Sequence, residues 1–235
     1  MTSTKNAGRL LGLLWFLTAA TGGFGLIYIR SRIIVPDDAA ATAAHIVANE
    51  FSYRAAIVSS LISQLFLFFL ALGFFHLFRG VNQRLATVLV ASGLVTVSIA
   101  VINTFNHFGA LLLLSQANFL KAFPPEQLQA MAFVFLRLAN STGQGLIEIF
   151  WAPYYISIGL LVLRSKFVPR MIGILLIAMG VGFAINILQK FLIPQFHPAL
   201  FTRLAMTGGA LGGLPTMVWL LIKGVRVEKL EGVAS

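Results

Sequence analysis

Long apolar runs separated by short polar stretches dominate this chain of 235 residues. A helix needs about 20 mostly apolar residues to cross the hydrocarbon core of a membrane, whereas membrane strands alternate over about 10 residues. These runs are long and do not alternate. Because only helices and closed barrels satisfy the backbone in lipid, the pattern predicts an all-α, polytopic integral membrane protein. The six runs long enough to span are Leu10–Ile29, Ala55–Phe78, Leu85–Leu114, Gln144–Leu163, Met171–Leu192 and Leu204–Ile222.

The six predicted spans are expected to form one bundle, a single transmembrane domain over residues 1–235. A short helix on the outer surface is predicted over Ala39–Glu50, because Pro36-Asp37-Asp38 before it is a helix-start signal. Pro124-Pro125-Glu126 is a second start signal, and no strong breaker follows before Pro153. A continuous helix from Glu126 to Arg164 would be roughly 58 Å long. Its first part is therefore expected to project outward or to lie at the membrane interface.

The distribution of Lys and Arg predicts the orientation, because cytoplasmic loops carry an excess of these residues. With six spans, both termini lie on one side. That side holds ten of the 17 basic residues: Lys5, Arg9, Arg79, Arg84, Arg164, Lys166, Arg170, Lys223, Arg226 and Lys229. The other seven are Arg30, Arg32, Arg54, Lys121, Arg137, Lys190 and Arg203. The split favours cytoplasmic termini.

The composition agrees with a membrane protein and excludes several other classes. Hydrophobic residues make up 58% and charged residues 10%, against roughly 25% charged in soluble domains. The mean hydropathy is +0.90. The net charge of +10 comes from basic residues between the apolar runs and not from a patch or arm, so nucleic acid is not an expected partner. Without cysteine, the chain has no disulfide, thiolate or iron–sulfur chemistry.

Polar residues inside the predicted spans suggest an intramembrane site. Glu148 is the only acid well inside a span, and such a carboxylate is a functional-site hypothesis by default. At 1.5 Å per residue it lies about 24 Å from the inner end of its span, and Asn186 lies about 25 Å from the inner end of the fifth. The candidate ligand-binding residues in this layer of the outer leaflet are Gln64, Asn103, Asn106, His107, Gln144, Glu148 and Asn186.

Two interpretations of this layer remain open. It forms a polar cavity open toward the outside, or its members hold helices together through interhelical hydrogen bonds of roughly 0.6 kcal/mol each. The second is favoured for single Ser, Thr and Asn residues, and the first for Glu148 with Gln144 and His107. Small residues at Gly208, Gly209, Gly212 and Gly213 are expected to permit a close helix–helix contact.

No cofactor, metal or catalytic group is predicted. His76 and His107 differ in depth by about 28 Å, which argues against a haem held by these two histidines. The ligand sets of zinc and di-iron sites are missing from the sequence, as are the H-E-x-x-H, G-x-S-x-G and P-loop motifs.

Several segments resemble one family. They are the early stretch Val35–Ala43, Glu126–Gln129, Phe150-Trp151, Gly159, the segment Arg164–Gly173 of pattern R-S-x-F-x-P-R-x-x-G, and Trp219–Gly224. Together they are similar to the bacterial multi-pass family catalogued as domain of unknown function 4386, over nearly the whole chain. The resemblance implies a six-span fold in the bacterial cytoplasmic membrane. It implies no catalytic residue.

Three classes of function fit these observations. The first is binding or transport through the polar cavity, with a small molecule or lipid as ligand. The second is an accessory or structural subunit, whose partner is a larger membrane complex or a second copy. The third, an intramembrane enzyme, has the least support because no nucleophile–base pair or metal set is visible. The two halves lack the internal symmetry typical of transporters of this size, which favours binding. Membrane lipids are expected partners in every case.

Overall fold

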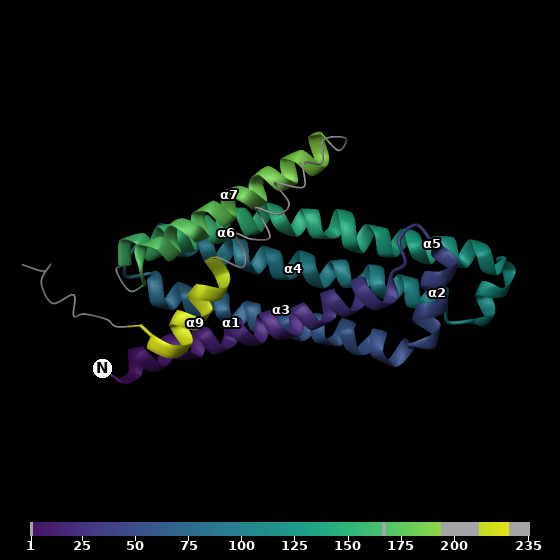
Figure 1. Cartoon of the computed structure of the whole chain (residues 1–235), viewed down its shortest axis with the longest axis horizontal. Coiled ribbons are helices and arrows are strands. Elements are labelled where there is room, and N and C mark those ends of the chain that lie inside the picture. Colours follow the sequence, from purple (N-terminus) through teal and green to yellow (C-terminus); the bar gives the residue numbers. More distant parts are fainter. Residues whose placement is uncertain (1, 166–167, 194–211, 226–235) are drawn as a thin grey trace, which may run out of the picture. The chain divides into compact units, whose positions relative to one another are not determined.

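The computed structural model describes residues 2–165, 168–193 and 212–225, and these residues form helices and short connections without a strand (Figure 1). Seven α-helices and three shorter helical segments follow one another, and a final α-helix comes after residues that the structure does not describe. Their bounds are α1 Thr2–Tyr28, η1 Ile29–Ile33, α2 Ala39–Ala48, α3 Glu50–Phe78, α4 Gln83–Leu113, η2 Asn118–Ala122, α5 Pro125–Arg137, η3 Leu138–Gly143, α6 Gln144–Ser165, α7 Arg170–Leu192 and α9 Leu214–Lys223.

Five of the described helical segments are long and apolar enough to cross a membrane. They are Asn6–Gly25, Glu50–Phe78, Gln83–Leu113, Pro125–Ser165 and Arg170–Leu192. Each contains or overlaps one of the first five predicted spans. The first part of the sixth, Leu204–Ile222, lies outside the described residues, and the rest is described from residue 212 onward, mostly as α9. The all-helical architecture is thus confirmed, with five helices able to span, and the count of six stays a prediction.

The chain divides into two compact units, and four helices contribute to both. The first unit comprises Met1–Leu17, Phe66–Thr96 and Glu148–Ser235. The second comprises Thr18–Leu65 and Val97–Ile147. The boundaries fall inside α1, α3, α4 and α6, so the chain passes from one unit to the other within helices and not through linkers.

In the first unit, small residues bring α6 and α7 backbone to backbone. A methyl group built on Gly159 would lie 2.6 Å from the carbonyl oxygen of Gly173, and one on Gly180 would lie 2.8 Å from the carbonyl oxygen of Ala152. Real Cβ atoms do not approach an oxygen so closely. Small interfacial residues are the usual means of bringing membrane helices together, because lipid gives them no hydrophobic drive to associate.

A glycine of α1 also makes a close contact with α9, and a second glycine makes one with α7 just before α9 begins. A methyl group on Gly12 of α1 would lie 2.6 Å from the backbone nitrogen of Leu221. Gly212, just before α9, sits against α7, where a methyl group would lie 3.3 Å from the carbonyl oxygen of Leu175. The predicted close contact is confirmed for Gly212. Gly213 makes only a distant contact with Trp15, and Gly208 and Gly209 lie outside the described residues.

The core of the second unit gathers aliphatic side chains around one buried tyrosine. Tyr53 near the start of α3 is fully buried. Around it pack Ile29, Ile33, Ile46, Ala56, Ile57, Ala110, Leu111, Ala132 and Leu136. These residues come from η1, α2, α3, α4 and α5, and α2 packs directly against α5. The short helix α2 is therefore anchored by its apolar side in this core.

Serine hydroxyls bind α3 to α1 within the second unit. Ser59 and Ser63 each donate a hydrogen bond of 2.9 Å, to the carbonyl oxygens of Thr21 and Thr18. Gly22 makes room for this approach, because a methyl group there would lie 2.6 Å from the Ser63 hydroxyl oxygen. These serines act as interhelical hydrogen-bond donors, the structural role that the sequence favours for single hydroxyl residues.

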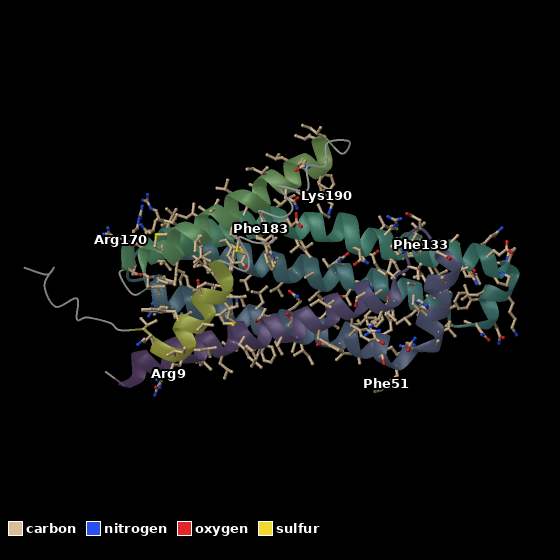
Figure 2. All side chains as sticks on the ribbon, in the orientation of Figure 1. Arg9, Phe51, Phe133, Arg170, Phe183 and Lys190 are labelled. Carbon is tan, nitrogen blue, oxygen red and sulfur yellow. The ribbon has the colours of Figure 1, made fainter. Side chains whose placement is uncertain are left out.

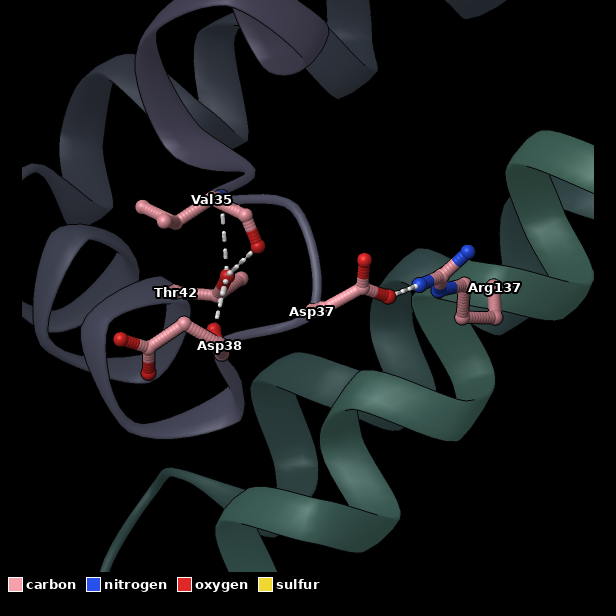
Figure 3. A network of polar contacts seen from close by, with 5 residues as sticks. All are labelled: Val35, Asp37, Asp38, Thr42 and Arg137. Carbon is pink, nitrogen blue, oxygen red and sulfur yellow. Dashed lines mark hydrogen bonds and ion pairs between the residues drawn. The ribbon is translucent and has the colours of Figure 1, made fainter.

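The predicted helix start before α2 is confirmed, and a threonine completes it (Figure 3). Asp38 is the N-cap, and its carboxylate accepts the N–H of Ala41 at 2.8 Å. The hydroxyl of Thr42 donates to the carbonyl of Asp38 at 2.7 Å and accepts the N–H of Val35 at 3.0 Å. Thr42 is buried. These bonds satisfy backbone groups that a helix start leaves unpaired.

The long helix predicted from the Pro124-Pro125-Glu126 signal is one continuous helical segment of 41 residues, Pro125–Ser165. Its middle part, η3, is a π-helix. In the second unit the amide of Asn103 donates to the carbonyl of Ala139 inside η3 at 3.0 Å. π-turns leave backbone groups outside the regular α-helical hydrogen-bond pattern and recur at functional sites. In η3 one such backbone group, the carbonyl of Ala139, accepts the hydrogen bond from the side chain of Asn103.

Candidate functional site

The strongest candidate site in the first unit centres on Glu148, which lies just past the start of α6 in an apolar helix. The amide of Asn186 on α7 donates a hydrogen bond of 2.6 Å to its carboxylate oxygen. Both side chains are partly buried. This short hydrogen bond directs the carboxyl group of Glu148 toward α7. A carboxyl group inside a membrane is expected to face protein or water and not lipid.

Three aromatic rings continue this face of the α6–α7 pair. Trp151 follows Glu148 by one helical turn, and Phe183 precedes Asn186 by one turn. The ring centroids of Trp151 and Phe183 are 5.3 Å apart, and Tyr155 stacks on Phe183 at 5.8 Å. Phe183 is labelled on α7 in Figure 2. The buried indole N–H of Trp151 has no hydrogen-bond partner among the described residues.

This arrangement combines a carboxyl group, an amide and aromatic ring faces. Ring faces attract cations, and a carboxylate beside them adds a charge or a hydrogen-bond acceptor. A few convergent polar groups on an apolar wall are typical of small-molecule sites. A ligand for such a group of side chains would need an apolar body and a polar group that donates hydrogen bonds or carries a positive charge.

The polar residues of α4 form a separate network in the second unit. The amide of Asn106 donates to the side-chain oxygen of Asn103 at 3.0 Å. The hydroxyl of Tyr53 is 2.8 Å from Nδ1 of His107. The structure thus brings Asn103 together with Asn106, and His107 together with a residue that the sequence analysis did not select. Tyr53 lies in a polar stretch just before the predicted second span. Only its hydroxyl group could have marked it in the sequence as a candidate site residue.

Two candidates remain, Gln64 and Gln144. In the second unit, the side-chain oxygen of Gln64 is buried without a hydrogen-bond partner in the described part of the chain. The side chain of Gln144 lies outside the part that the structure describes. Within each unit, the described hydrogen bonds join Glu148 to Asn186 in the first and Asn103 to Asn106 in the second. Their role in ligand binding stays a prediction.

No metal site accompanies these groups in the described ranges 2–165, 168–193 and 212–225. Within them, no three His, Asp or Glu side chains lie close enough together to hold an ion.

Comparison with known proteins identifies the family. The family model described as Domain of unknown function (DUF4386) matches residues 10–224. The chain belongs to this family. No curated protein and no solved structure matches the chain. Membership in DUF4386 agrees with the resemblance seen in the segment Arg164–Gly173, and it adds no activity, because the family is uncharacterised.

Proposed function

We propose that this DUF4386 protein is a non-enzymatic protein of the bacterial cytoplasmic membrane that binds a small amphipathic molecule or a lipid. In this proposal both termini are cytoplasmic and the ligand enters a polar cavity from the outer leaflet. The observation that supports it best is the hydrogen bond between Asn186 and Glu148 beside the rings of Trp151, Tyr155 and Phe183. A buried carboxyl is costly in lipid, and an apolar residue would pack the helix pair at no such cost.

A lipophilic amine is a suitable probe for this site. We expect the purified full-length protein to bind it, and Glu148→Gln to weaken binding at least 10-fold while the thermal midpoint stays unchanged, because the amide keeps the shape and the hydrogen bond to Asn186. Glu126→Gln, at an exposed position of α5, is the matched control and should bind as wild type. Equal binding by Glu148→Gln and Glu126→Gln would refute the proposal.

The alternative is an accessory subunit of a larger membrane complex. Its support is that only a minority of the residues in four of the five candidate spans is buried within the chain, so lipid or another protein must cover the rest. Purification with gentle detergent, followed by native mass spectrometry, separates the two. A stoichiometric protein partner together with no amine binding would favour the subunit role.

A further inference from the structure

A cavity lies wholly within the second unit, at the end where α5 meets the loop before α2. Its volume is about 270 Å³. Ile34, Pro36 and Phe133 give it an apolar wall, and Asp37 and Arg137 place one negative and one positive side chain at its edge. Ligand pockets for drug-sized molecules are about 300–1,000 Å³, so this cavity matches a smaller polar headgroup with the first part of an apolar chain.

The two charged side chains of this cavity form an ion pair with each other (Figure 3). They are far from buried, because the side chain of Arg137 is 58% exposed and that of Asp37 is 85% exposed. Exposed ion pairs contribute little stability. A ligand can therefore displace this pair at small cost if it supplies a new partner for each charge.

The backbone and a ring fix the two charges in position. Asp37 has a φ of 58°, the left-handed region that few residues other than glycine adopt, and it is followed directly by the capped start of α2. Arg137 lies over the ring of Phe133, with its guanidinium carbon 5.1 Å from the ring centroid. Both side chains are thus directed to the mouth of the cavity before any ligand arrives.

We propose that this cavity binds a zwitterion that carries a primary ammonium and a phosphate, the chemistry of a phosphoethanolamine group. The phosphate takes the place of Asp37 on the planar fork of Arg137, which matches phosphate oxygens well. The ammonium pairs with the released carboxylate of Asp37. An anion alone would be repelled by the released carboxylate of Asp37, and a cation alone would be repelled by Arg137. A zwitterion supplies a partner of opposite charge to each side chain, so neither charge is left unpaired.

The position of the cavity along the chain agrees with a headgroup. Arg137 precedes the predicted span at Gln144 by seven residues, about 10 Å along a helix, which is just outside the hydrocarbon core. Asn140 lies between them on the wall of the cavity, and its amide donates to the carbonyl of Leu136 at 2.9 Å. The apolar wall would meet the glycerol end of a lipid, while the charges face the aqueous side.

Calorimetric titration of the purified full-length protein tests this proposal with three probes: glycerophosphoethanolamine, short-chain phosphatidylethanolamine and short-chain phosphatidylglycerol. We expect one or both ethanolamine compounds to bind at least 10-fold more tightly than phosphatidylglycerol. Asp37→Asn and Arg137→Gln should each abolish that preference. Asn tolerates the left-handed backbone at position 37, and both sites are exposed, so folding should be retained and is checked by the thermal midpoint.

The matched control is another exposed ion pair of this unit, Arg54 with Glu50, at 2.7 Å and with both side chains about half exposed. Glu50→Gln with Arg54→Gln should leave the preference intact. Binding of the lipid probe identifies a membrane lipid as the source, and binding of glycerophosphoethanolamine alone identifies a soluble zwitterion. Equal binding of all three probes, or an equal loss in the control variant, would overturn the proposal. Neither result depends on Glu148, which lies in the other unit.

Discussion

The hydroxyl of Tyr53 is buried in the core of the second unit and has one described partner, Nδ1 of His107. Replacing Tyr53 with Phe removes the hydroxyl and leaves Nδ1 of His107 without this hydrogen bond. A buried polar atom that loses its partner costs about 1–3 kcal/mol. We expect Tyr53→Phe to lower the free energy of unfolding in detergent by that amount.

Tyr154 offers a control of the same chemistry. Its hydroxyl is also buried, but it has no hydrogen-bond partner among the described residues. Tyr154→Phe should therefore be neutral or slightly stabilising, because it removes a polar atom that gains nothing from burial. Equal destabilisation by the two substitutions would show that the contact with His107 is not the cause.

Single residues show how far the sequence can predict a site. Counting residues placed Glu148 and Asn186 at nearly the same depth, and these two side chains do form a hydrogen bond. Depth alone does not give the rotation of each helix about its axis. The amide of Asn103, which is predicted in the same layer, donates to the carbonyl of Ala139 in η3, a partner that depth alone does not identify. The pairing of Tyr53 with His107 depends on the same unknown rotation.

Two side chains, Asp38 and Thr42, hold the loop before α2 to its helix. Thr42→Val keeps the shape of the side chain but removes its hydrogen bonds to the N–H of Val35 and the carbonyl of Asp38. The Asp38 carbonyl keeps the backbone N–H of Thr42 as a partner, whereas the partly buried N–H of Val35 loses its hydrogen bond, so we expect a loss of about 1–3 kcal/mol of stability. Hydrogen exchange should show faster opening of α2. Thr42→Ser retains the hydroxyl and should show normal exchange; fast exchange in both would exclude the hydroxyl as the cause.

The α6–α7 contact and an open position in α1 predict opposite effects for two glycine substitutions. Gly159→Ala places a methyl group against the backbone of α7, and such overpacking typically costs about 1–3 kcal/mol. A methyl group on Gly23 of α1 would have no neighbouring atom within 4 Å, so Gly23→Ala should stabilise by about 0.5–1 kcal/mol through helix propensity. Thermal midpoints in detergent measure both. A stabilised Gly159→Ala would contradict the close contact.

The helices themselves were predictable, but their irregular turns were not. Apolar runs located the five described spans, and Pro36-Asp37-Asp38 located the start of α2. The π-helices at Ile29–Ile33 and Leu138–Gly143 have no such signal. A π-turn depends on contacts with neighbouring helices, such as the bond from Asn103, and these contacts appear only once the helices are packed.

The molecule as a whole is expected to span the membrane six times with both termini in the cytoplasm. This rests on the apolar runs and on the ten-to-seven split of the 17 basic residues. A reporter that is active only in the cytoplasm should be active when fused after Ser235 and inactive when fused at Asn118. The reverse pattern would invert the orientation. Equal activity at the two sites would place them on one side of the membrane and would contradict three spans between them.

The paired glycines of α6 and α7 also constrain how this sequence can change over time. A side chain on Gly159 would strike the carbonyl of Gly173, and one on Gly173 would lie 3.0 Å from the carbonyl of Gly159. Neither substitution can be rescued by shrinking the facing residue, because the obstacle on each side is backbone. Relatives that keep this helix spacing should therefore retain both glycines. A lineage that loses one has no reason to keep the other, so the two positions should be lost together.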